Sequence, residues 1–97
     1  MSIIYLIPGN LSSSNYGIKE IKRRENLLKK WAFPNSKIKV FDVPNGGSSI
    51  ESSYEEIASI IPAVDRLLEL NKFENIEAAI IGCFGDPGLD VFREMFD

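Results

Sequence analysis

Cys83 is the residue best suited to chemistry, and it is the only cysteine in a chain of 97 residues that contains no histidine. It follows the apolar run 77–82 and precedes Asp86 and Pro87, which favour a helix N-cap and a first helical position. The dipole of a helix that starts there would stabilise a thiolate over a thiol. The sequence thus predicts that Cys83 acts as a base or nucleophile, against the alternative of a buried, inert thiol. Asp86 is expected to be a cap rather than a catalytic acid.

The missing residue types narrow the chemistry available to this chain. One cysteine cannot form an internal disulfide, and without histidine neither a Ser-His-Asp or Cys-His site nor a zinc site built from His and several Cys is possible. An active Cys83 would therefore depend on backbone dipoles.

The charge of the chain argues against a nucleic-acid partner, and the lengths of its apolar runs argue against a membrane. The net charge is −3 and the pI is about 4.9, and the basic residues Lys22 to Arg24, Lys29 and Lys30 fall within a helical pattern. They are interpreted as a solvated helix face. The opening apolar run is too short for a signal peptide and no run is long enough to cross a membrane, so we expect a cytoplasmic protein.

Three loops rich in Gly, Ser or Asn, at residues 8–15, 44–53 and 83–88, are expected to form the ligand site. Each follows a predicted strand, and the ligand crevice of an open parallel sheet lies beyond the carboxyl ends of its strands. Backbone N–H groups and helix dipoles at such loops suit a small carboxylate or an imide-like ring. For the first loop, a simple turn is an equally good interpretation. The dinucleotide and P-loop glycine spacings are absent.

The elements that must position these loops alternate between strand and helix. Apolar runs predict strands over 3–7, 37–43 and 77–82. Helices are predicted up to Pro34, after the Ser52 and Glu55 capping box, and from Asp86 onwards, with Pro62 expected to kink the second or start a new segment. The expected apolar faces of the three helices are, in order, Ile18, Ile21, Leu27, Leu28 and Trp31; Ile57, Ile60, Ile61, Val64, Leu67 and Leu68; and Leu89, Phe92 and Phe96.

This alternation predicts an α/β fold, with a parallel sheet covered by helices on both faces. The whole chain, 1–97, is expected to be a single incomplete lobe. The last helix reaches Asp97 with neither a C-cap glycine nor a basic last turn, and the apolar strand at 77–82 would form an exposed edge. We therefore expect further strands in the intact gene product.

Residues 80–90, Ile-Ile-Gly-Cys-Phe-Gly-Asp-Pro-Gly-Leu-Asp, resemble the first cysteine motif of hydantoin and allantoin racemases, in the aspartate/glutamate racemase superfamily. Residues 49–56 resemble a second segment of that branch, and Ile7-Pro8-Gly9-Asn10 with Ser12 and Ser13 resembles its opening strand and loop. The family usually has Asn on both sides of the proline, whereas this chain has Ile7 and Gly9. This departure puts the substrate contacts of the first loop in question.

The resemblance implies a two-lobed enzyme with its substrate between the lobes and without pyridoxal phosphate, any other cofactor or a metal. One cysteine from each lobe faces the stereocentre, so that one thiolate removes the Cα proton while the opposite thiol delivers another. Cys83 matches the first-lobe cysteine, and the second would lie in sequence absent here. The implied substrate contacts are the backbone of Phe84 and Gly85, and Asn10 with Ser12 or Ser13; the substrate is a hydantoin, an allantoin or a related amino-acid derivative.

Two other functions stay open at this point. The chain is alternatively an inactive truncated lobe that binds a small anion, unless two chains pair as a homo-oligomer to supply both cysteines. A redox-sensing role for Cys83 would need only an accessible thiol of low pKa, but it leaves the Gly-Asp-Pro-Gly context unexplained.

Overall fold

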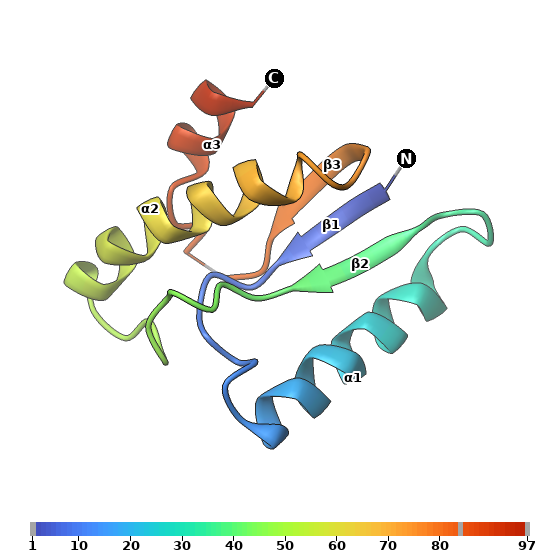
Figure 1. Ribbon diagram of the computed structural model, residues 1–97, viewed down its shortest axis with the longest axis horizontal. Helices are drawn as coiled ribbons and strands as arrows, with labels where there is room; N and C mark the ends of the chain where they lie inside the picture. The colour runs from blue at the N-terminus through green and yellow to red at the C-terminus, as the bar shows by residue number, and fades with distance from the viewer. Residues whose placement is uncertain (1, 84, 97) are drawn as a thin grey trace.

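A computed structural model describes residues 2–83 and 85–96, which form three strands and three helices in strict alternation. The elements, shown in Figure 1, are β1 (Ser2–Leu6), α1 (Asn15–Trp31), β2 (Ile38–Phe41), α2 (Ser53–Leu70), β3 (Ile76–Ile81) and α3 (Leu89–Met95). The predicted strands are confirmed, with ends that differ from the predicted ones by one to two residues.

The strands form a parallel sheet in the order β2-β1-β3, so the first strand of the chain lies at its centre. Ile3 pairs with Ile38 on one side and with Ala78 on the other. Between Ser2 and Ile3 the register against β3 shifts by one residue, which leaves Glu77 as the extra residue. The predicted α/β class and parallel sheet are confirmed.

The main core lies between the sheet and α2. Ile4 and Leu6 of β1 are almost wholly buried and belong to one cluster with residues of α2 and Phe92 of α3. The second face of the sheet belongs to α1, which runs beside β2 in Figure 1 and contacts it. The α2 contribution to the cluster consists of Ala63, Val64, Leu67 and Leu70.

Ser52 caps α2 as predicted, but the return bond to Glu55 comes from the Glu51 N–H and not from the Ser52 N–H of a capping box. The Ser52 hydroxyl accepts the Glu55 N–H at 3.2 Å, and the Glu55 carboxylate accepts the Glu51 N–H at 3.1 Å. The new segment expected at Pro62 is wrong, because α2 continues through this residue as one helix from Ser53 to Leu70. The kink expected there stays a prediction. Because proline has no N–H, the helix lacks one backbone hydrogen bond at this residue, and the apolar contacts of the flanking turns keep the helix intact.

The predicted apolar faces of the first two helices are only partly buried. Val64 and Leu67 are buried, but Ile57 and Ile61 are 69% and 71% exposed. On α1, Trp31 is 75% and Ile18 is 51% exposed. A sheet of three strands offers less surface than these wide stripes would cover, so part of each stripe faces solvent.

The predicted start of the third helix at Asp86 and Pro87 is wrong. The helix begins at Leu89 after Gly88, and no side chain caps it. Instead, the Leu89 N–H donates to the Asp86 carbonyl at 3.1 Å across Pro87 and Gly88, whose φ is 77°. Pro at the second position and a positive-φ Gly at the third define a type II turn, which competes with a helix start. The predicted apolar face is retained, with Phe92 buried and Phe96 packed against the core.

Strand β3 lies at an edge of the sheet. Residues 77–80 are exposed, and Ile80 retains 46% of its surface. The expectation that this apolar strand forms an exposed edge is therefore confirmed in the described residues. None of the described helices is long and apolar enough to span a membrane.

Candidate functional site

Three loops leave the sheet at the same end, the carboxyl end of its strands, because all three strands run parallel. The loop after β1 is joined to the loop after β2 by two backbone hydrogen bonds. Asn10 N–H donates to the Gly47 carbonyl at 2.8 Å, and Val43 N–H donates to the Gly9 carbonyl at 3.0 Å. These loops form one ordered surface beside the carboxyl ends of β1 and β2.

Asp42 ties the first loop to the end of β2, and the sequence pattern did not single it out. Its side chain is buried, and one carboxylate oxygen accepts the N–H of Leu11 at 2.9 Å and that of Ser12 at 2.7 Å. Its carbonyl accepts a bond from Arg66 Nε at 3.0 Å, and the Arg66 guanidinium lies 5.5 Å above the Phe41 ring. The available signal was an acidic residue near the end of the otherwise apolar predicted strand 37–43.

The backbone N–H groups of the first loop are already engaged in hydrogen bonds within the chain. Every N–H from Gly9 to Ser14 donates to an oxygen of this chain. Backbone binding of an anion, which the sequence suggested for all three loops, is therefore not available here. The loop can contact a ligand only through the side chains of Asn10, Ser12 and Ser13.

Asn10 and Ser13 also bond to each other locally. Asn10 Oδ1 accepts the Ser13 N–H at 3.2 Å, which leaves the Asn10 amide NH₂ as the group able to donate to a ligand. Asn10 and Ser12 are half-buried, whereas Ser13 is exposed. These side chains present neutral donors and acceptors at the sheet edge.

Cys83 lies two residues beyond β3 and is half-buried, outside the apolar core. The Gly82 N–H donates to the Leu6 carbonyl at 2.8 Å, which extends the β1 pairing to the residue before the thiol. A Cβ on Gly82 would lie 2.5 Å from the Tyr5 ring. Gly82 is therefore the residue that lets the chain pass Tyr5 and bring Cys83 to the end of the sheet.

The third loop continues from Cys83 through turns rather than into a helix. Asp86 N–H donates to the Cys83 carbonyl at 3.1 Å, and Asp86 has a φ of 43°. Because α3 starts only at Leu89 and is a short helix of seven residues, its dipole is further from the thiol than the sequence suggested. The predicted contact residue Phe84 lies outside the described residues.

Gly85 is exposed and lies near the first turn of α2. A Cβ on Gly85 would be 3.3 Å from the Glu56 carboxylate. This carboxylate can accept a hydrogen bond from a ligand N–H but repels an anion. Glu56 is a second site residue that sequence reasoning did not assign a role, although it lies in the segment 49–56 singled out above.

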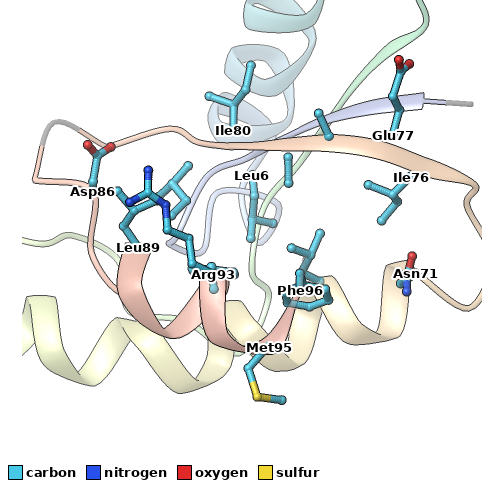
Figure 2. Close-up of a pocket in the computed structure, with 15 residues that line it drawn as sticks. Leu6, Asn71, Ile76, Glu77, Ile80, Asp86, Leu89, Arg93, Met95 and Phe96 are labelled. Carbon is cyan, nitrogen blue, oxygen red and sulfur yellow. The ribbon is translucent and has the colours of Figure 1, made fainter.

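Two hollows occur in the surface formed by the described residues. The larger, about 700 Å³, lies between β3 and α3 and is lined by residues such as Leu6, Ile80 and Phe96 (Figure 2). The smaller, about 380 Å³, lies near Val43 and Ile61. Neither includes Cys83 or Asn10, and the described residues hold no cluster of three or more Cys, Asp or Glu side chains suited to a metal ion.

Two curated proteins are similar to this chain. The hydantoin racemase of Pseudomonas sp. (strain NS671) is 37% identical over 73 residues, which cover 75% of this chain and 29% of that protein. The hydantoin racemase of Paenarthrobacter aurescens is 30% identical over 60 residues, which cover 62% of this chain and 25% of that protein. This chain is similar to part of the hydantoin racemases. The resemblance seen in the sequence is thereby confirmed.

The hydantoin racemase-like chain matches less than a third of the length of either relative. No protein-family model and no solved structure matches it. The predicted site residues lie on loops at the carboxyl end of the strands: Asn10, Ser12 and Ser13 after β1, and Cys83 and Gly85 after β3. Asp42 contacts Ser12, and Glu56 lies near Gly85.

Proposed function

We propose that this chain contributes one side of a cofactor-independent racemase site for a hydantoin, an allantoin or a related amino-acid derivative, with Cys83 as one of two acid/base thiols. The observation that carries the proposal is the position of Cys83, half-buried at the carboxyl end of β3, in a chain similar to hydantoin racemases. Loops at this edge are where parallel α/β sheets bind small ligands.

The proposed reaction inverts a carbon acid by two proton transfers. The Cys83 thiolate takes the Cα proton, and the C–H electron pair moves into the adjacent carbonyl to give an enolate. A second thiol, from sequence beyond this chain, then gives a proton to Cα on the opposite face. The enolate electron pair forms the new C–H bond as the carbonyl re-forms, and the second sulfur is left as a thiolate. Backbone N–H groups at Phe84 and Gly85 are proposed to stabilise the enolate oxygen.

The remaining residues are proposed to hold the substrate. Asn10, with Ser12 or Ser13, would bond to ring carbonyls through side chains, because the backbone donors of this loop are engaged. Glu56, beside Gly85, would accept a ring N–H. A hydantoin offers both kinds of group, which a simple carboxylate does not.

The isolated chain is proposed to be inactive as a racemase, because one thiol serves one face of the substrate. Incubating it with an optically pure 5-substituted hydantoin should leave the optical rotation unchanged. Clear racemisation by the isolated chain would contradict this part of the proposal, unless two chains combine their thiols.

A chimera tests the role of Cys83 directly. Joining this chain to the remaining part of the Pseudomonas sp. relative should restore racemisation and exchange of the Cα proton in D₂O, read by NMR. Cys83→Ser should abolish both, while Ser36→Ala, at a turn between α1 and β2, should retain both. Full activity of the Cys83→Ser chimera would refute the assignment.

A further inference from the structure

Asp42 binds two neighbouring N–H groups of the first loop with a single oxygen. Its Oδ2 accepts the N–H of Leu11 at 2.9 Å and the N–H of Ser12 at 2.7 Å. Successive N–H groups that converge on one point in a turn form the kind of concave backbone site that binds anions. These two N–H groups form such a site, the Leu11–Ser12 cradle. The Asp42 oxygen therefore lies where an oxygen of a bound carboxylate would lie.

Contacts other than those to Asp42 also hold the Leu11–Ser12 cradle in place. Before the two donors, the Asn10 N–H donates to the Gly47 carbonyl at 2.8 Å. After the Leu11 N–H, the Leu11 carbonyl packs so closely against α1 that a Cβ on Gly17 would collide with it. The loop backbone is thus fixed on both sides, so the direction of the two N–H groups does not depend on Asp42 alone.

The Asp42 side chain is enclosed, and it adjoins the candidate substrate contacts. Only 5% of the Asp42 surface is exposed, and the Asp42 carbonyl accepts a bond from Arg66 Nε at 3.0 Å. Ser12 connects the cradle to the candidate site, because its N–H donates to Asp42 and its side chain is one of the candidate substrate contacts. A carboxylate in this position occupies the two donors and also repels a second anion.

We propose that Asp42 is a specificity-determining residue, which fills the Leu11–Ser12 cradle and thereby selects neutral rings over substrates that carry a free carboxylate. The consequence for the substrate rests on the proposed function, whereas the occupation of the cradle does not. Asp42 acts through the backbone of the first loop and does not itself touch the substrate. Replacing it by a residue without a side-chain acceptor should open the cradle to a small carboxylate.

Formate tests the cradle in this chain, because it is small enough to replace the carboxylate that Asp42→Ala removes. Titrating this variant with formate, at an ionic strength held constant with chloride, should shift the Leu11 and Ser12 amide signals in the NMR spectrum until they saturate. Formate should also raise the melting temperature of Asp42→Ala, since a ligand that binds only the folded state stabilises it. The wild type should show neither effect.

Two variants control for the loss of charge and for the acceptor. Asp65→Ala removes an exposed carboxylate of α2 and should behave as the wild type does. Asp42→Asn keeps an oxygen in the cradle and should gain no formate binding. The proposal is overturned if Asp42→Ala gains neither amide shifts nor stability from formate, or if the wild type responds as strongly as this variant.

The racemase chimera tests the consequence for the substrate. The ring-opened form of a hydantoin carries a free carboxylate. It should inhibit racemisation of the hydantoin about tenfold to a hundredfold more strongly in the Asp42→Ala chimera than in the parent chimera, the gain expected from hydrogen bonds to a charged group. The Asp65→Ala chimera should match the parent.

The outcomes separate this inference from the proposed function. Equal inhibition of the Asp42→Ala and parent chimeras would overturn the role of Asp42 in specificity, even where formate binds. A parent chimera without racemase activity would instead contradict the proposed function. Binding of the ring-opened form to the Asp42→Ala chain but not to the wild type, followed at the Leu11 and Ser12 amides, would then support the role of Asp42, and equal binding to both would overturn it.

Discussion

The Asp42 carboxylate accepts the Ser12 N–H at 2.7 Å, so the residue that directly follows β2 determines the path of the loop that leaves β1. The same oxygen accepts the Leu11 N–H, and the Asp42 carbonyl is bound by Arg66 of α2. One residue thereby connects two of the three site loops and the main helix. The candidate substrate contacts Asn10, Ser12 and Ser13 depend on this connection.

Replacing Asp42 by Ala should loosen the first loop. Two partly buried N–H groups would lose their acceptor, at a cost of about 1–3 kcal/mol in the free energy of unfolding. Amide hydrogen exchange at Leu11 and Ser12 should accelerate. Asp42→Asn, which keeps an oxygen at this position, should cost less; equal losses for the two variants would mean that the carboxylate oxygen is not the important acceptor.

Replacing Gly88 by Ala should destabilise the turn before α3. Gly88 has a φ of 77°, and an added Cβ would lie 2.8 Å from Ile60 Cγ2. We expect a loss of about 1–3 kcal/mol, measured by chemical denaturation. Gly47→Ala is the matched control, because its added Cβ would meet nothing closer than 3.7 Å. A neutral Gly88→Ala would show that the turn adopts another conformation in solution.

The length of α2 leads to a prediction for Pro62. The helix runs through this residue although proline has no N–H to donate. Pro62→Ala should therefore raise the free energy of unfolding, by about 1–3 kcal/mol. Thermal unfolding followed by circular dichroism measures the change. Destabilisation instead would mean that the proline ring contacts are worth more than the missing hydrogen bond.

Glu20 should give α1 a pH dependence. Hydrogen bonds from Arg23 and then Arg24 lower the pKa of the Glu20 carboxyl from 4.5 to about 2. A lowered folded-state pKa stabilises the fold fully above the unfolded-state value, and this contribution is lost as the pH falls from about 4.5 through about 2. Glu20→Gln should be slightly less stable than the wild type at pH 7 and equal to it below pH 2. A difference that persists at the lowest pH would contradict this origin.

Much of the fold could be predicted because hydrophobic patterns and local caps are encoded in adjacent residues. The alternation of strands and helices and the Ser52 cap of α2 are examples. The third helix start was wrong because Asp86-Pro87-Gly88 suits a type II turn as well as a helix N-terminus, and packing of Gly88 on Ile60 accompanies the turn. The exposure of Ile57 and Ile61 could not be predicted, because it depends on how wide the sheet is.

The site was only partly predictable for a related reason. Loop composition identified Asn10, Ser12, Ser13 and Cys83 as candidates. Their position at the same end of the sheet follows from the parallel direction of the strands alone. The use of the first-loop N–H groups by Asp42 and the position of Glu56 beside Gly85 depend on contacts between distant segments. Whether these residues bind a substrate stays a prediction.

The extra residue at Glu77 has a consequence for the evolution and engineering of β3. Ile76 and Ile81 both pack against the core, although five positions apart in a regular strand would put them on opposite faces. The extra residue at Glu77 shifts the alternation by one position, so that both isoleucines lie on the core face. Deleting Glu77 would put the two isoleucines four positions apart, so a regular strand paired to β1 in the same register could direct both of them toward the core.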